Sequence, residues 1–232
     1  MRPHRILVTV TIAAFIATGI SQIPGPGWAA DTPAGNVSVP GSALNSLIGE
    51  QEGHFNQAID LYIKGDFHGA ASEIRSGAAL LRMEAGRASG EDAAKLQAAA
   101  SDLDTLATNI VSGNVGSRRD LELAFGNADL ALAAHYHALA SQALAAKDHA
   151  AAGRWLKAAA DSLDDATSWT GERPPATQAE AQDQMHALQA KIRTGAAWSE
   201  DEAKKGMNYL GTQIQYLGQQ MQGGSKVKSI SP

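Results

Sequence analysis

The feature that most constrains the fold of this chain is a pattern of helix-forming residues that recurs after 82 residues. Asp66 in the first copy aligns with Asp148 in the second, and the register continues without a gap from 54–113 to 136–195. Apolar and small residues at helical spacing match between the copies, as in the pairs Ala70 and Ala152, Ile74 and Leu156, Leu81 and Leu163, Ile110 and Ile192, and Gly113 and Gly195. A fixed period of this kind is typical of a duplicated supersecondary unit.

Nearly the whole stretch from Ser42 to about Gln222 has a helical pattern, with abundant alanine and apolar residues three and four apart. The expected helices cover about 42–63, 66–88, 91–113, 118–146, 148–170 and 175–222, the last with a break near Gly195. No alternating β-branched run and no Asn-Gly hairpin turn is present. We predict one all-α domain over 42–222, a helical bundle of two three-helix pseudo-repeats with 200–221 as a C-terminal capping helix. Residues 223–232 are expected to form a disordered tail.

The first thirty residues have the three regions of a secretory signal peptide. Arg2 and Arg5 supply positive charge, and residues 6–20 form an apolar run. Small residues allow cleavage after Ala29 or Ala30, and 31–41 follows as a flexible leader. The apolar run is shorter than the roughly 20 residues that a membrane-spanning helix needs. We therefore expect a periplasmic or secreted protein with no stable membrane insertion after cleavage.

Composition and motifs narrow the functional classes. The chain has no cysteine, which excludes disulfides, thiolate metal sites and cysteine nucleophiles. A formal net charge of −5 and the lack of a basic cluster argue against nucleic acid as a partner. Neither Gly-x-Ser-x-Gly nor His-Glu-x-x-His occurs. We expect a non-enzymatic protein that needs no cofactor.

Histidine and carboxylate side chains offer an alternative, a site for a transition metal ion. The candidate ligands are His54, His135, His137 and His186, with Glu50 and Asp183 each one turn before a histidine. His135 and His137 are two residues apart on one helix and face about 200° away from each other, so they cannot share an ion. His54 corresponds to Tyr136 in the repeat, so His54 could approach one of these two across the units.

Two acidic patches are candidate calcium sites. One consists of Asp161, Asp164 and Asp165, and the other of residues 200–202. Calcium needs six or more oxygen ligands, usually supplied by a loop, and no EF-hand spacing is present. We interpret the patches as solvated helix faces, and the second also suits the start of a helix.

Three tryptophans are candidate binding residues. Trp155 and Trp169 are fourteen residues apart, which is close to four helical turns, so they share one face of a helix. Trp198 lies at the expected break before the capping helix. Tryptophan is a common anchor at protein interfaces, but large aromatic side chains are also mostly buried. Packing against the C-terminal helices is therefore the alternative interpretation.

Residues 54–88 and 136–170 each combine an Ala-rich helix, a short turn at Gly65-Asp66 or Lys147-Asp148, and a returning helix with alanine and leucine at four-residue steps. This pattern resembles the tetratricopeptide-type hairpin, although that family's Trp-Leu-Gly-Tyr signature is missing and its period is shorter. It also resembles the YfdX family of exported bacterial helical proteins, which carry two copies of a similar hairpin. That resemblance implies a stress-linked, chaperone-like binding role and no catalytic residues.

These features predict an exported, non-enzymatic helical binding protein with a protein partner or client, acting by protein–protein interaction or as a holdase under envelope stress. The alternative is a metal- or small-ligand-binding bundle that uses histidine and carboxylate side chains. The first hypothesis requires an exposed apolar groove between the repeats, with Trp155 and Trp169 as anchors. The second requires two or more of the histidines within about 5 Å of each other beside a carboxylate.

Overall fold

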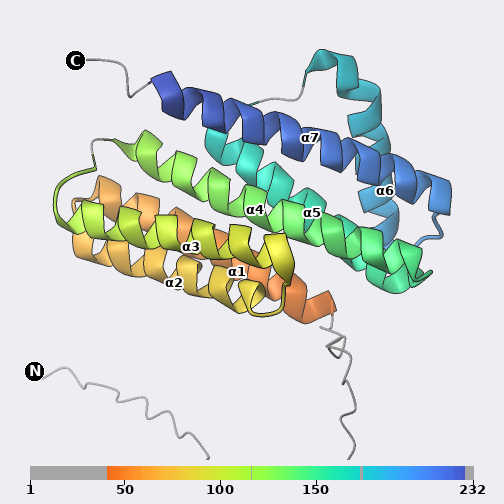
Figure 1. Ribbon diagram of the computed structural model, residues 1–232, viewed down its shortest axis with the longest axis horizontal. Coiled ribbons are helices and arrows are strands. Elements are labelled where there is room, and N and C mark those ends of the chain that lie inside the picture. The colour runs from red at the N-terminus through yellow and green to blue at the C-terminus, as the bar shows by residue number, and fades with distance from the viewer. Residues whose placement is uncertain (1–40, 116, 173–174, 228–232) are drawn as a thin grey trace, which may run out of the picture. The chain divides into compact units, whose positions relative to one another are not determined.

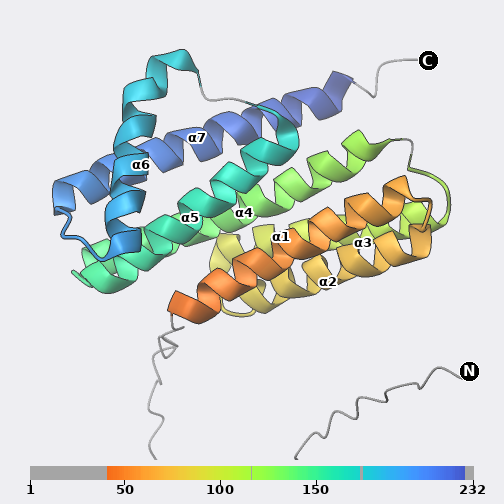
Figure 2. The ribbon, with the colours of Figure 1, turned by 180° about the vertical axis from the view of Figure 1, so that it is seen from behind.

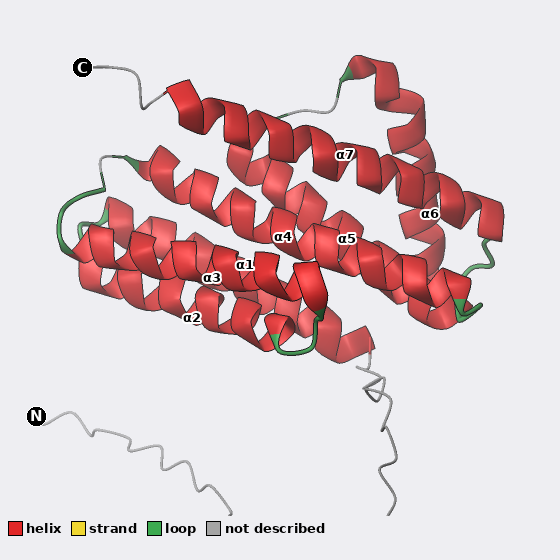
Figure 3. Ribbon diagram, viewed as in Figure 1, coloured by secondary structure: helices red, strands yellow, loops and turns green. Residues whose placement is uncertain are grey.

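The computed structural model describes residues 41–115, 117–172 and 175–227, which form seven α-helices and one short 3-10 helix (Figure 1). The helices are α1 (Gly41–Ile63), α2 (Phe67–Ala85), α3 (Gly90–Val111), α4 (Arg118–Ala145), α5 (His149–Thr170), η1 (Ala176–Gln178), α6 (Ala179–Thr194) and α7 (Glu200–Val227). The described residues contain no β-strand, which confirms the all-α prediction (Figure 3).

Most helix boundaries lie within a few residues of the predicted ones. Gly195, with φ +70°, divides the long C-terminal stretch into α6 and α7 as expected. Helix α7 continues to Val227, so the start of the predicted tail is helical. The predicted signal peptide, the leader up to residue 40 and residues 228–232 lie outside the described residues. No helix in the described part of the chain is long and apolar enough to cross a membrane.

The first three helices pack as an antiparallel group in which α1 and α3 both lie along α2 (Figures 1 and 2). Helices α4 and α5 form a second antiparallel pair with the most extensive helix–helix contact. The two groups meet where α3 packs on α4, and where α1 packs on α4 and α5. At this junction the rings of Phe55 and Phe125 stack with their centroids 4.2 Å apart. One continuous apolar core therefore joins the groups.

Helix α4 is covered on several sides, because it contacts α1, α3, α5 and α7. The residues that it buries are mostly small, which lets the neighbouring helices approach closely. At Gly126, for example, an added Cβ would lie 2.7 Å from Thr170 Cγ2 and 3.3 Å from the Ala166 carbonyl oxygen of α5. The same cover buries two polar side chains of α4, Asp129 and His135.

The turns that carry the two capping aspartates have matching geometry. Asp66 and Asp148 have φ, ψ of −83°, 76° and −85°, 83°. Each carboxylate accepts a hydrogen bond of 2.9 Å from the backbone N–H three residues later. The preceding residue is left-handed in both turns, Gly65 with φ +79° and Lys147 with φ +59°. A non-glycine residue in this region costs roughly 1–2 kcal/mol, so the second turn is the more strained one.

The third helices of the two expected units, α3 and α6, pack on different neighbours. Helix α3 buries seven residues, whereas α6 buries only Met185 and Leu188 and packs mainly on α7 (Figure 2). The sequence contains a physical reason for this difference. Three buried residues of α3, Leu96, Ala100 and Ala107, correspond at the 82-residue spacing to Gln178, Gln182 and Gln189. A glutamine amide loses its hydrogen bonds to water in a closed apolar interface, so α6 cannot lie along α5 as α3 lies along α2.

Candidate functional site

Exposed apolar side chains gather where α1 and α3 end and α2 begins. Ile63 at the end of α1 is 61% exposed, Phe67 at the start of α2 is 44% exposed, and Val111 at the end of α3 is 41% exposed. We call these three residues the apolar end. Large aliphatic and aromatic side chains usually lose most of their exposure on folding. An exposed group of them is typical of surfaces that contact another molecule.

The apolar end rests on an ordered framework. The Tyr62 ring lies against the Phe67 ring, with centroids 5.6 Å apart. The Tyr62 hydroxyl donates to the Val115 carbonyl oxygen at 3.3 Å, which ties α1 to the segment after α3. Phe67 is the first residue of α2 and follows the capping Asp66 directly. The position of its ring is therefore set by a cap, a ring contact and a helix start.

The corresponding end of α4 and α5 is different. The residues 82 positions after Ile63, Phe67 and Val111 are Ala145, His149 and Arg193. The indole of Trp198 packs edge-on against the His149 ring, with centroids 5.6 Å apart. An added Cβ on Gly153 would meet that indole at 3.4 Å, so the small residue admits Trp198 onto the start of α5. Ala145, Lys147 and His149 nevertheless stay exposed, so the second turn differs from the first because the residues that it exposes are small or polar.

The other two candidate tryptophans flank the core. Trp155 is stacked on Tyr136, with ring centroids 5.8 Å apart. Trp169 meets Phe125 edge-on at 5.4 Å. All three candidate tryptophans are partly buried and packed against the core. Their ring partners lie on α4 and α5 and not on the C-terminal helices of the alternative interpretation, and the larger exposed apolar side chains lie elsewhere.

The four candidate histidines have separate surroundings. His54 Nδ1 pairs with Glu73 of α2 at 2.6 Å, and His137 Nε2 lies 3.0 Å from the Met207 carbonyl oxygen of α7. His186 is exposed on α6, as are the candidate carboxylates Glu50 and Asp183 on their helices. The fold does not bring the histidines together. Among the described residues, no group of three or more histidine, aspartate and glutamate side chains is arranged to hold a metal ion.

His135 is the buried histidine of α4. Its Nδ1 is 3.9 Å from an Asp92 carboxylate oxygen of α3, and neither ring nitrogen has a hydrogen-bond partner among the described residues. Burial lowers the pKa of His135, and the nearby Asp92 carboxylate offsets part of that shift. The neutral imidazole therefore acts as a core side chain, stabilised by packing beside Tyr136.

A buried carboxyl group joins α1 to α4. Gln51 Nε2 donates to Asp129 Oδ1 at 2.9 Å, and Asp129 Oδ2 has no partner within the described part of the chain. Burial raises the pKa of Asp129 well above its usual range, and the Asp165 and Glu52 carboxylates raise it further, while Trp169 lowers it. This shift favours the protonated form of Asp129, which lowers the cost of holding the carboxyl group in the core.

The acidic face of α5 is less solvated than its sequence suggested. Burial raises the pKa of Asp165 to about 7, and the charges of Glu52, Asp161 and Asp164 add to the shift. Asp161 itself pairs with Lys157 one turn earlier. Asp164 is exposed, as expected of a solvated face, whereas Asp161 and Asp165 are half-buried, because α1 and α4 pack over part of α5.

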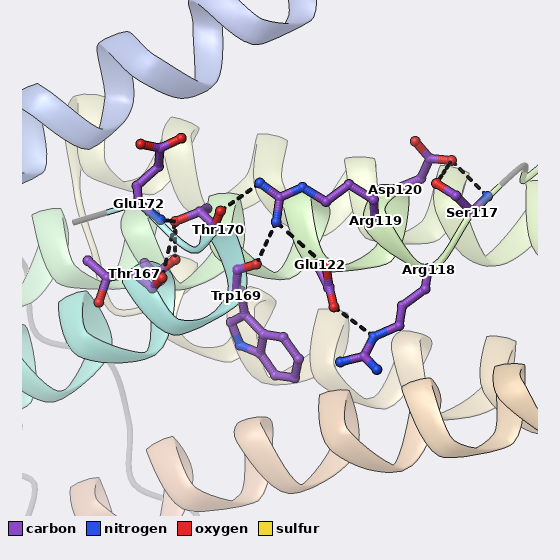
Figure 4. A network of polar contacts seen from close by, with 10 residues as sticks. Ser117, Arg118, Arg119, Asp120, Glu122, Thr167, Trp169, Thr170 and Glu172 are labelled. Carbon is purple, nitrogen blue, oxygen red and sulfur yellow. Dashed lines mark hydrogen bonds and ion pairs between the residues drawn. The ribbon is translucent and has the colours of Figure 1, made fainter.

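Arg119 of α4 holds the C-terminal end of α5 (Figure 4). Its guanidinium donates to the carbonyl oxygens of Trp169 and Thr170 at 3.1 and 2.6 Å, and the Glu122 carboxylate lies 3.6 Å away. A cation at a helix C-terminus compensates the partial negative charge of the free carbonyl groups. The Glu172 N–H donates to Thr170 Oγ1 at 3.4 Å, so the chain that leaves α5 is held as well.

Sequence reasoning did not identify the residues of the apolar end. The available signal was the helical spacing. Tyr62 and Ile110 lie on the apolar faces of their expected helices, and Ile63 and Val111 directly follow them and so point to another face. Searches for related proteins add no assignment, since no protein-family model, no curated protein and no solved structure matches the chain.

Proposed function

We propose that this chain is an exported, non-enzymatic binding protein that holds an apolar segment of another protein at the apolar end. The observation that carries the proposal is the exposure of Ile63, Phe67 and Val111 at one end of the first helical group. Covering these side chains with those of a partner would remove apolar surface from water. A partly unfolded envelope protein exposes such segments, so the activity would be that of a holdase.

We also propose that the domain arose from two copies of one three-helix unit, with α7 as an added cap. Support comes from the equal geometry of the turns at Asp66 and Asp148 and from Gly113 and Gly195, which both have φ +70°. Matched backbone at the 82-residue spacing is expected of a duplicated unit. In this scheme α6 has left its original position, and only the first turn exposes large apolar residues, because the second has Ala145, His149 and Arg193 in their place.

The test replaces the three apolar residues of the apolar end by the residues at the corresponding positions of the second turn. The variant Ile63→Ala/Phe67→His/Val111→Arg gives the first turn the residues found at the corresponding positions of the second. Capture is measured as suppression of light scattering from insulin that is reduced with dithiothreitol. The chain has no cysteine, so the reductant does not alter it. We expect the native sequence to suppress scattering and the triple variant to lose most of that activity.

The matched control is Met83→Gln, which removes an apolar side chain that is 46% exposed near the other end of α2. This variant should capture insulin as the native sequence does. Circular dichroism of every variant verifies that the helices are retained. Equal capture by the triple variant and the native protein would refute the proposal.

Export is tested separately by sequencing the N-terminus of protein recovered from the periplasm or the medium. We expect the mature chain to begin at Ala30 or Asp31, as cleavage after Ala29 or Ala30 requires. Recovery of the protein in the cytoplasm with residues 1–30 intact would remove export from the proposal.

A further inference from the structure

A small cleft lies where α6 crosses away from α5, between α5, α6, α7 and the chain that leaves α5. Its cavity volume is about 40 Å³. The polar side chains that line it are Asp164, Thr167, Glu172, Gln182, Tyr209, Gln213 and Tyr216. Leu163 and Leu217 supply an apolar wall. None of these residues belongs to the apolar end, so the cleft is a second and separate site.

The cleft carries negative charge without a basic residue in its lining. Two of its residues, Asp164 and Glu172, are acids, and neither lysine, arginine nor histidine is among the residues that line it. Burial raises the pKa of Asp164; nearby His186 acts in the opposite direction, and Asp161 raises the pKa further. Holding a carboxylate in this setting is unfavourable unless a cation approaches it. The cleft therefore favours a positively charged ligand.

The aromatic side chains favour an organic cation. Tyr209 and Tyr216 line the same cleft. Burial, together with the Asp164 charge, raises the pKa of Tyr209, so its phenol stays neutral. The face of a neutral tyrosine ring attracts an ammonium group, and the attraction increases when water is excluded. An alkyl chain attached to that group would lie against Leu163 and Leu217.

Two contacts hold the lining in place. Gln213 is buried, and its amide nitrogen donates to Gln178 Oε1, which leaves the Gln213 amide oxygen as an acceptor. On the other side, the Glu172 N–H is bonded to Thr170, and Arg119 fixes the Thr170 carbonyl (Figure 4). Acceptors whose positions are already set lose little entropy when a ligand binds.

The size of the cavity limits the ligand. One water needs about 10–15 Å³ of such volume, so the cleft accepts a group the size of a few waters. A sugar or nucleotide needs several hundred Å³. A bare divalent metal ion also fits poorly, because within the described residues no three histidine or carboxylate side chains converge on one point. A single charged head group with its first methylenes fits the volume.

We propose that this cleft binds a primary alkylammonium group, with Asp164 and Glu172 as its charge partners and Tyr209 and Tyr216 around it. An ammonium group has three N–H donors, which match the two carboxylates and the Gln213 amide oxygen. Two sources present this chemistry, a free diamine and the side chain of a lysine in a peptide.

The experiment is isothermal titration of the full mature chain at 150 mM salt, which screens the long-range attraction of an acidic protein for any cation. The probes are 1,4-diaminobutane, N-acetyl-lysine methylamide, methylguanidine, and 1-butanol as the neutral control. We expect one or both ammonium probes to bind and butanol not to bind. Binding of the diamine alone assigns a free amine, and binding of the lysine derivative alone assigns a peptide side chain.

Variants locate the site. Asp164→Asn and Glu172→Gln should each weaken binding about tenfold, the usual effect of losing one charge-assisted hydrogen bond. The matched control Asp183→Asn removes an exposed acid of α6 that does not line the cleft, and it should bind as the native chain does. The ring resonances of Tyr209 and Tyr216 should shift on titration.

Three results would overturn the assignment. One is no binding of either ammonium probe at 10 mM, and another is equal affinity of the native chain, Asp164→Asn and Glu172→Gln. The third is tighter binding of methylguanidine than of both ammonium probes. Circular dichroism of each variant separates loss of binding from loss of fold.

Discussion

Helices α3 and α6 lie 82 residues apart in corresponding places of the sequence, yet they pack on different neighbours. Helix α3 lies along α2 and closes the first group of helices, and α6 crosses to α7. Because α6 moves away, α7 covers α4 and α5 instead and leaves a cleft beside α6. The comparison teaches that two segments of similar pattern can pack on different neighbours when buried apolar positions of one are glutamine in the other.

The turns at Gly65 and Lys147 also share their backbone geometry and differ in their exposed side chains. Both begin a helix with a capping aspartate, and both place a left-handed residue before it. The turn at Lys147 exposes Ala145 and His149, and the turn at Gly65 exposes Ile63 and Phe67. Local backbone geometry is therefore shared, and the chemical character of the exposed surface is decided by the side chains at corresponding positions.

The largest expected effect comes from truncating one buried leucine in α3 and one in α6. Leu103 of α3 and Leu188 of α6 are 1% and 2% exposed, so they are equally buried. Leu103→Ala should lower the free energy of unfolding by about 3 kcal/mol, because α3 is part of the main core. Leu188→Ala should lower it by only about 1 kcal/mol, because α6 can detach while the rest stays folded. Urea unfolding followed by circular dichroism measures both values.

Hydrogen exchange provides the control for this pair. Amide protons of α6 should exchange faster than those of α3 in the native chain, and Leu188→Ala should accelerate only α6. Equal losses of global stability in the two variants would mean that α6 is as much a part of the core as α3.

A second comparison adds a methyl group at two helix crossings. At Gly77 of α2, a new Cβ would lie 2.5 Å from the Phe55 ring, which is buried and stacked on Phe125. Gly77→Ala should therefore cost about 1–3 kcal/mol of stability through overpacking. At Gly206 of α7, the nearest atoms, at 2.9 Å, are the flexible ends of Leu188 and Met185. Gly206→Ala should be close to neutral, since the gain in helix propensity of about 1 kcal/mol offsets the small shift.

Thermal unfolding of the two glycine variants measures the difference directly. If Gly206→Ala lowered the unfolding temperature as much as Gly77→Ala, α6 would be held rigidly on α7.

A change of pH should have an intermediate effect on the free energy of unfolding. Asp129 and Asp165 have raised pKa values in the folded chain, Asp165 to about 7, so the folded state binds more protons than the unfolded state between about pH 4 and 7. Their contribution to stability is thus fully present at acidic pH and is lost as the pH rises through the folded pKa. Asp129→Asn mimics the protonated form and should reduce this loss at pH 8.

The measurement is urea unfolding of the native chain and of Asp129→Asn at pH 5 and pH 8. The control is Asp102→Asn, which changes an exposed aspartate of α3. Asp102→Asn should keep the pH dependence of the native chain. An unchanged pH dependence in Asp129→Asn would contradict the assignment of a protonated core carboxyl group.

The smallest expected effect concerns the two left-handed turn residues. Lys147→Gly should stabilise the chain by up to about 1 kcal/mol, because glycine adopts positive φ without steric cost. Gly65→Ala should destabilise it by a similar amount for the same reason. Thermal unfolding measures both shifts. If both variants had the same sign, the two turns would not share the backbone geometry described above.

Much of the secondary structure was predictable because it depends on neighbours in sequence. The apolar spacing placed the helices, the aspartates at 66 and 148 marked two helix starts, and Gly195 marked the break between the last two helices. The candidate sites were less predictable. The sequence around Asp129 and His135 does not distinguish them from any other polar residue of an Ala-rich helix. They are buried only because α4 has neighbours on several sides.

The sequence by itself determined the helical class, the caps and the breaks, since these follow from hydrogen bonds and side-chain spacing within a few residues. The tertiary structure alone decided that α6 packs on α7, that Trp198 packs against His149 at the start of α5, and that Ile63, Phe67 and Val111 stay exposed where α1 and α3 end. Which face of a helix is covered depends on contacts between residues far apart in the chain. The cleft beside α6 has the same origin, because its acids and tyrosines come from helices that only packing brings together.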